Sequence, residues 1–206
     1  YDYYGFPEES YSIKYPCRGE PILASQINSV LLDAGFESKL DEERGFDHGV
    51  WVPLALAWPE ADIPIVQISI DPDETPEYHY KLGRALSSLA HENIALIGSG
   101  NITHNLHAVF TRGTNADTDQ KMKVYADEFL SWFNSQIDSG NSDMFLNYRE
   151  NAPFSEENHP TDEHLLPIFF TLGAAGENYR AEKLHQSFTF DFLAMDAWGF
   201  HPQTSA

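Results

Sequence analysis

The sequence predicts an α/β fold, with a central mostly parallel or mixed sheet flanked by helices. Two β-branched apolar runs, 62–71 and 94–100, are typical of strands that are buried on both faces of a sheet. A stretch able to form a helix follows each run after a short turn. Strand, helix, strand, helix in this order indicates helices packed on a sheet. A length of 206 residues suits a single domain over 1–206.

The remaining elements follow from local patterns. Residues 1–17 are aromatic and rich in turns, and apolar residues recur at helical spacing from 18 to 36. A short strand is expected near 38–41. Helices or helical turns are expected over 52–58, 75–93, 101–110, 118–138 and 158–176, and a strand or hairpin over 185–200.

The charge balance excludes several partners. Lys and Arg number 12 against 32 Asp and Glu, which gives a net charge of −20. Such a surface repels phosphate backbones and anionic lipids, so we expect no nucleic-acid partner and no membrane partner. The single Cys17 excludes an internal disulfide and a cysteine-rich zinc site, which fits a cytoplasmic protein.

Ligands of such sheets gather at the carboxyl ends of the strands. This rule selects the loop ISIDPDE, after the first run, and the loop GSGNITHN, after the second. The second loop carries His104, flanked by the amides of Asn101 and Asn105, which can orient its ring. A Gly-Ser-Gly turn also occurs in phosphate loops, but no lysine follows it here.

Two further histidines stand where chemistry is expected. In GFDHGVW, His48 lies beside Asp47 and close to Phe46 and Trp51, so it is either a satisfied loop residue or a proton-transfer group in an aromatic-walled pocket. In PTDEHLLP, His164 follows Glu163, one turn into the expected helix, where it is either a packed residue or a ligand.

Adjacent side chains on a helix diverge by roughly 100°, so only one of Glu163 and His164 is expected to face a site. We expect His159 to be a helix cap or an exposed residue. His79 and His91 are expected on an exposed helix face. Three loop histidines and a carboxylate suit a site for one metal ion, or a proton shuttle assisted by a metal.

Read together, four motifs resemble the class III extradiol ring-cleaving dioxygenases, and in particular their 4,5-DOPA extradiol dioxygenase branch. In order along the chain, the motifs are RGFDHGVWVPL, PEADIPIVQISID, LIGSGNITHNL and NHPTDEHLLPIFFTLGAAG. The resemblance runs along nearly the whole chain. It implies an α/β fold and an enzyme that inserts both atoms of O₂ into a small-molecule catechol, beside the hydroxyl groups of the ring.

The resemblance also implies a non-haem metal, usually Fe(II), with zinc as the alternative. His164, in PTDEH, corresponds to a metal ligand of the family. His104, in THN, corresponds to a histidine that acts as acid/base or as a ligand. His48, in DHG, is expected to bind substrate or to shuttle a proton, with Trp51 and Phe46, together with Tyr4, walling the aromatic ring.

The family's HGSP and SAHW motifs, which carry two more ligands, are absent from these residues. The resemblance therefore implies a catalytic domain truncated at its N-terminus, which lacks its first strands and can be inactive. Two other functions stay open on the same fold, a hydrolase with zinc-bound water and a non-catalytic binding protein. The sequence does not choose between a monomer and a homo-oligomer.

Overall fold

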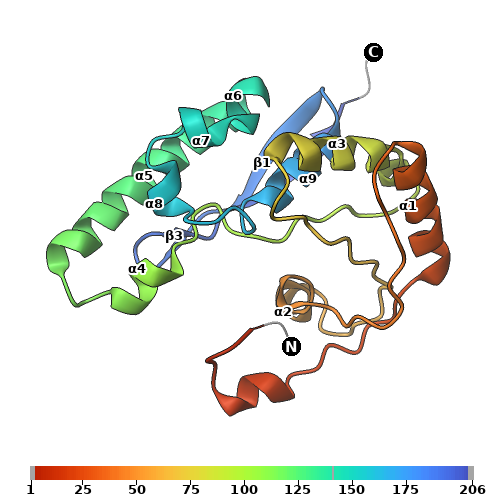
Figure 1. The fold of residues 1–206 in the computed structure, drawn as a ribbon, viewed down its shortest axis with the longest axis horizontal. Coiled ribbons are helices and arrows are strands. Elements are labelled where there is room, and N and C mark those ends of the chain that lie inside the picture. Colours follow the sequence, from red (N-terminus) through yellow and green to blue (C-terminus); the bar gives the residue numbers. More distant parts are fainter. Residues whose placement is uncertain (1–2, 141, 204–206) are drawn as a thin grey trace. The chain divides into compact units, whose positions relative to one another are not determined.

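The computed structural model describes residues 3–140 and 142–203. The chain divides into two compact units, Tyr1–Ser69 (unit 1) and Ile70–Ala206 (unit 2), whose elements are drawn in Figure 1. The single domain expected over 1–206 stays a prediction.

Unit 1 is built from short helices joined by extended chain. It contains η1 (Glu8–Ser12), α1 (Pro21–Asp33) and α2 (His48–Ala57). Helix α1 confirms the helix expected over 18–36: Pro21 occupies its first turn, where no backbone donor is needed, and the Glu20 carboxylate accepts from the backbone of Ile22. Ile27 and Leu31 are its buried residues.

Unit 2 contains the longer helices. They are α3 (Pro76–Leu86), η2 (Ser87–His91), α4 (Leu106–Thr111), α5 (Ala116–Ser139), α6 (Ser142–Leu146), α7 (Tyr148–Asn151), α8 (Ser155–Asn158) and α9 (Leu166–Ala175). Figure 1 shows α3 beside α9, and α8 beside α5. The helix expected over 118–138 is confirmed as α5, and the stretch 75–93 forms α3 and η2.

Aromatic side chains fill the core of unit 2. Helices α5 and α9 contribute Phe129, Phe133 and Phe169, all completely buried, and the short helices add Phe145 and Tyr148. Their rings contact one another at centroid distances such as 4.9 Å for Phe133 and Phe145. Burial of large aromatic surfaces dominates the stability of such a core.

The strands of unit 2 follow the last helix. They are β1 (Tyr179–His185), β2 (Phe188–Thr189), β3 (Leu193–Ala194) and β4 (Ala197–Pro202). Strand β1 pairs antiparallel with β4, Tyr179 lying opposite Pro202 and Lys183 opposite Trp198, and β2 pairs antiparallel with β3. The hairpin expected over 185–200 is therefore confirmed.

The α/β class is confirmed, but the sheet differs from the expected one. Among the described residues, strands pair only in these two antiparallel sheets. The runs 62–71 and 94–100 are extended without forming strands, apart from an isolated parallel bridge between Gly19 and Ile65, and 38–41 is not a strand either.

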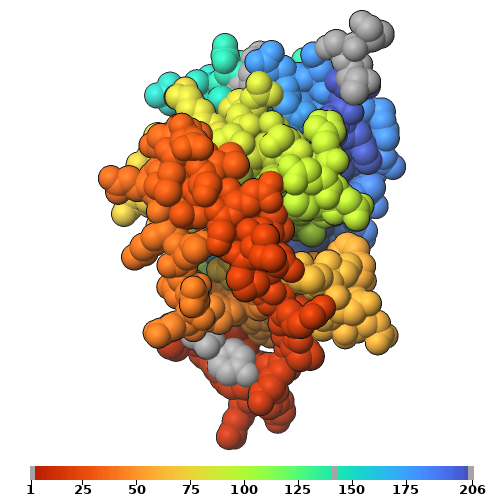
Figure 2. Space-filling model, turned by 90° about the vertical axis from the view of Figure 1, so that its right-hand side faces the viewer, coloured from red at the N-terminus to blue at the C-terminus, as the bar shows by residue number. Residues whose placement is uncertain are grey.

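The surroundings of the run 94–100 explain why it does not form a strand. Gly98 and Gly100 face the start of α9 so closely that a β-carbon on either would overlap a backbone oxygen, of Pro167 or of His164. On the other side Ile97 is 56% exposed, and this yellow-green stretch reaches the surface in Figure 2. A strand needs hydrogen-bonded neighbours, and apolar composition alone does not supply them.

No helix in the described part of the chain has the length and apolar character needed to cross a bilayer.

Candidate functional site

Two of the predicted histidines meet in unit 2. The rings of His104 and His164 are stacked, with centroids 3.5 Å apart and planes inclined by 12°. Both residues are half-buried, so each is partly reachable from solvent.

Backbone hydrogen bonds bring the two loops together. The His104 N–H donates to the carbonyl of Asn158 (2.9 Å), and the Asn101 N–H donates to the carbonyl of His164 (2.8 Å). The Asn105 amide donates to the carbonyl of Glu157 at 2.8 Å. The close approach of Gly100 to the His164 carbonyl leaves no room for a side chain there.

The loop of His104 is fixed from a second direction as well. The buried Thr103 hydroxyl donates to the carbonyl of Phe192 (2.7 Å) and accepts from the N–H of Ala194 (2.7 Å). The segment 101–104 is thus held between 158–164 and 192–194, which restricts the positions that the His104 ring can take.

Glu163 is a member of the site that the sequence reasoning missed. Its Oε1 lies 3.2 Å from Nδ1 of His164 and accepts a hydrogen bond of 2.8 Å from the Thr161 hydroxyl. Burial opposes ionisation of this carboxyl, but the Thr161 hydroxyl, its own backbone and His164 outweigh that effect, so the pKa of Glu163 lies below its usual value.

The expectation that only one of Glu163 and His164 faces the site was wrong. Helix α9 begins at Leu166, and residues 160–165 form turns and bends before it. Helical spacing therefore does not separate the two side chains, and both join the cluster. The adjacent Glu-His pair just ahead of a proline was the available signal.

The cluster can hold a metal ion. Ligand atoms of His104, Glu163 and His164 all lie within 4.8 Å of one another. Two ligands bound to one cation at about 2.1 Å lie at most about 4.2 Å apart, which is close to this separation. Because the lone pairs of stacked imidazoles lie in nearly parallel planes, at least one of the two rings has to turn before both can bind the same cation. Two imidazole nitrogens and one carboxylate form a donor set that suits divalent iron and zinc.

A half-buried polar network involves Asp162, the residue before Glu163 in the sequence. The Tyr148 hydroxyl donates to Oδ1 of Asp162 at 2.6 Å, and the Arg149 guanidinium pairs with the same carboxylate. Burial raises the pKa of Tyr148 to about 12, so this hydroxyl keeps its proton and remains a donor. Arg149 also donates to the carbonyl of His159 at 2.5 Å and to that of Ser155 at 3.1 Å.

Three histidines outside the cluster differ in burial. His159 is completely buried, not the exposed residue or helix cap expected, because it packs among the aromatic rings of the core. Burial lowers the pKa of His159 to about 4, so its ring is neutral. His79 is also buried rather than exposed: Nε2 accepts from the N–H of Asp71, and Nδ1 donates to the carbonyl of Thr75. His91 is exposed, as expected.

His48 lies in unit 1, at the first turn of α2. Asp47 caps this helix by accepting from the N–H of Val50 (3.2 Å), and its carboxylate also accepts from the Gln67 amide at 2.8 Å. The Tyr3 ring contacts both His48 and Trp51, each at 6.1 Å between centroids.

Aromatic rings lie near His48 in unit 1, and the wall of Trp51, Phe46 and Tyr4 expected around the substrate ring stays a prediction. Phe46 and Trp51 are half-buried, and Tyr3 makes the ring contacts, whereas Tyr4 is 88% exposed. His48 belongs to unit 1 and the stacked pair to unit 2, and their approach to a common pocket stays a prediction.

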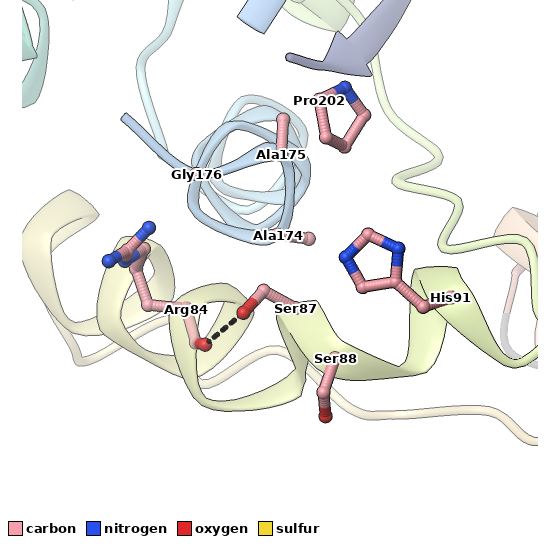
Figure 3. A pocket seen from close by; sticks show the side chains of 8 residues that line it. All are labelled: Arg84, Ser87, Ser88, His91, Ala174, Ala175, Gly176 and Pro202. Carbon is pink, nitrogen blue, oxygen red and sulfur yellow. Dashed lines mark hydrogen bonds between the residues drawn. The ribbon is translucent and has the colours of Figure 1, made fainter. Parts of the chain in front are cut away.

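A cavity of about 360 Å³ lies elsewhere in unit 2 (Figure 3). Its lining consists of Arg84, Ser87, Ser88, His91, Ala174, Ala175, Gly176 and Pro202. The predicted site residues are not among these. Arg84 lies in the last turn of α3 near the C-terminus of α9, where its positive charge compensates the helix carbonyls.

Comparisons with known proteins agree with the motifs. Residues 1–200 match the family model described as the catalytic LigB subunit of aromatic ring-opening dioxygenase. The 4,5-DOPA dioxygenase extradiol of Beta vulgaris is 39% identical over 97% of this chain and 73% of its own length. The protein of the same name from Mirabilis jalapa is 33% identical over 99% of this chain and 74% of its own length.

A solved structure shares the fold. The crystal structure of an uncharacterized protein from Escherichia coli K12 superposes with a TM-score of 0.71 at 31% sequence identity. The match covers 91% of this chain and 75% of that chain.

Proposed function

We infer that this chain, which belongs to the LigB family of aromatic ring-opening dioxygenases, cleaves a catechol-type ring. The reaction would use a metal held at His104 and His164. Relatives named 4,5-DOPA dioxygenase extradiol support an extradiol reaction, with O₂ entering beside the hydroxyl groups and a 4,5-DOPA-like substrate. The stack of His104 on His164, with Glu163 against it, is the observation that carries the metal site.

The metal we propose is Fe(II), with zinc as the alternative. Two imidazoles and a carboxylate supply the neutral nitrogen and anionic oxygen ligands that both cations accept. When bound, the metal acts as a Lewis acid that lowers the pKa of the catechol hydroxyls and offers open positions for O₂.

The histidines take different roles in this proposal. Because Nδ1 of His164 faces Glu163, we assign Nε2 of His164 as the atom that binds the cation. His104 is either the second imidazole ligand or, off the cation and neutral, the base that accepts a proton from a catechol hydroxyl and returns it later in the reaction. Glu163 is either a third ligand or the group that fixes the orientation of His164.

Substrate contacts are proposed in unit 1. His48 forms a hydrogen bond with the catechol oxygens, as donor or acceptor. Trp51 and Phe46 pack against the catechol ring. The half-buried state of all three, with Tyr3 in contact with His48 and Trp51, supports an aromatic-walled surface that a flat ring can contact.

Oxygen uptake tests the proposal. The protein loaded with Fe(II) is expected to consume O₂ when L-DOPA or another catechol is added, with a yellow ring-cleavage product appearing in parallel. His164→Ala is expected to abolish both signals, whereas His91→Ala, which changes an exposed histidine, leaves them unchanged. Uptake by the wild type without ring-cleavage product would contradict the proposal.

A zinc-loaded protein that hydrolyses an ester or amide and consumes no O₂ would favour the hydrolase instead. The cytoplasmic location stays a prediction, and the choice between a monomer and a homo-oligomer stays open.

A further inference from the structure

His159 lies inside unit 2, next to the candidate site and outside it. Its side chain is completely buried, with the rings of Phe129 and Tyr148 at centroid distances of 5.6 Å and 6.3 Å. Its Nε2 lies 2.7 Å from the carbonyl oxygen of Ile102. Since a carbonyl can only accept, Nε2 carries the proton and donates it.

The other ring nitrogen of His159, Nδ1, forms no hydrogen bond with the described residues. In the neutral ring Nδ1 is an acceptor, and it finds no hydrogen-bond donor among the described residues. An unpaired polar atom in a core costs free energy, and a phenylalanine would fill the same space without it. Packing alone therefore does not account for a histidine here, whereas the donor to Ile102 is something that an apolar side chain cannot supply.

The bond to Ile102 lies in the middle of the contact between the two histidine loops. On one side of it the Asn101 N–H donates to the carbonyl of His164, and on the other the His104 N–H donates to the carbonyl of Asn158. The His159 side chain thus connects the same segments, 101–104 and 158–164. Its hydrogen bond is made to Ile102, two residues before His104.

His159 is itself firmly held. The Arg149 guanidinium donates to its backbone carbonyl at 2.5 Å and pairs with Asp162. The Ser155 hydroxyl in turn donates to the carbonyl of Arg149 at 2.9 Å. Because the backbone of His159 is held by these hydrogen bonds, its Nε2 donor can restrict the position of the Ile102 carbonyl.

We propose that His159 is a positioning residue, whose Nε2 donor holds the segment 101–104 against 158–164 so that the His104 and His164 rings stay stacked. This role rests on the proposed function, in which that pair handles the metal and the proton. His159 touches neither the metal nor the substrate in this role.

A matched pair of substitutions tests the donor. In His159→Gln the amide nitrogen reaches about as far as Nε2, and in His159→Asn it reaches only as far as Nδ1. We expect the Asn variant to speed hydrogen exchange of the His104 and Asn101 amides by about tenfold or more, followed by NMR. Its affinity for Zn²⁺ should fall by about tenfold or more, and the Gln variant should retain both properties.

Phe129→Leu is the control for a general loss of stability. It removes a ring that contacts His159 and leaves the donor in place. We expect it to lower the melting temperature while exchange at His104 and the Zn²⁺ affinity stay near the wild-type values. His159→Phe, which fills the core, replaces the Asn variant if that variant does not fold.

Wild-type exchange rates and Zn²⁺ affinity in the folded Asn or Phe variant would overturn the proposal. If the amides respond as expected while the wild type binds no Zn²⁺, the positioning role is supported and the metal site of the proposed function is what fails.

Discussion

The imidazole rings of His104 and His164 lie face to face at 3.5 Å, although they come from loops that are distant in the sequence. Each ring is placed by a backbone bond to the other loop, His104 through Asn158 and His164 through Asn101. The two imidazoles that we propose as ligands are therefore held close together by the chain itself, and this arrangement reduces the entropy that binding a cation has to overcome.

Replacing His164 tests the ligand assignment. His164→Ala removes one of two imidazoles, so we expect the purified protein to lose its metal, measured by atomic emission after dialysis. Full metal occupancy in this variant would show that His164 is not a ligand. His91→Ala, at an exposed histidine, is the matched control.

Glu163→Gln tests the carboxylate next to that ligand. The amide keeps the size of the side chain and loses its charge, so metal affinity should fall by about 10- to 100-fold. A competition titration with a zinc-binding dye measures the change. Glu156→Gln, at an exposed position nearby, should leave the affinity unchanged, and an equal loss in both variants would mean that only the overall charge matters.

His48→Ala tests the role proposed for unit 1. Because His48 is proposed to contact substrate and not metal, the variant should keep its metal content and lose turnover by about 10² or more. Metal content and oxygen uptake are measured on the same sample. Loss of metal would place His48 among the ligands. Unchanged turnover would mean that His48 is a satisfied loop residue with no role in the reaction.

The burial of His159 predicts a dependence of stability on pH. Its pKa is about 4 in the folded protein and 6.5 in the unfolded chain, so only the unfolded chain takes up a proton between these values. Stability is therefore expected to fall as the pH is lowered from 6.5 to 4, by about 3 kcal/mol from this group. Urea unfolding at several pH values measures the slope.

His159→Gln does not titrate and isolates that contribution. Its free energy of unfolding should fall less steeply over the same pH range than that of the wild type. Parallel slopes would mean that His159 is not the group responsible.

Tyr148→Phe removes the hydroxyl that donates to Asp162 at 2.6 Å. Among the described residues, Arg149 is then the remaining side-chain partner of the Asp162 carboxylate, and we expect the free energy of unfolding to fall by about 1 to 3 kcal/mol. Chemical denaturation of the two proteins gives the difference. A neutral effect would mean that water replaces the hydroxyl without loss.

Helices were the more predictable part of the fold. Apolar residues at helical spacing, as in the stretches that form α1 and α5, are a local signal that lies within the helix itself. The runs 62–71 and 94–100 were different, because strand pairing depends on neighbours that local sequence does not specify.

The candidate site was predictable in part. The motifs singled out His104 and His164, and the structure brings these two together. Glu163 was missed because a helix was expected where the chain forms turns. The burial of His159 was missed because nothing local reveals that Phe129 and Tyr148 will enclose it.

Anomalous diffraction at the zinc edge, on crystals of the protein soaked with Zn²⁺, tests the central claim most directly. A peak within bonding distance of Nε2 of His164 and of the His104 ring is the result that we predict. A peak at other side chains, with these two imidazoles unliganded, would contradict the account.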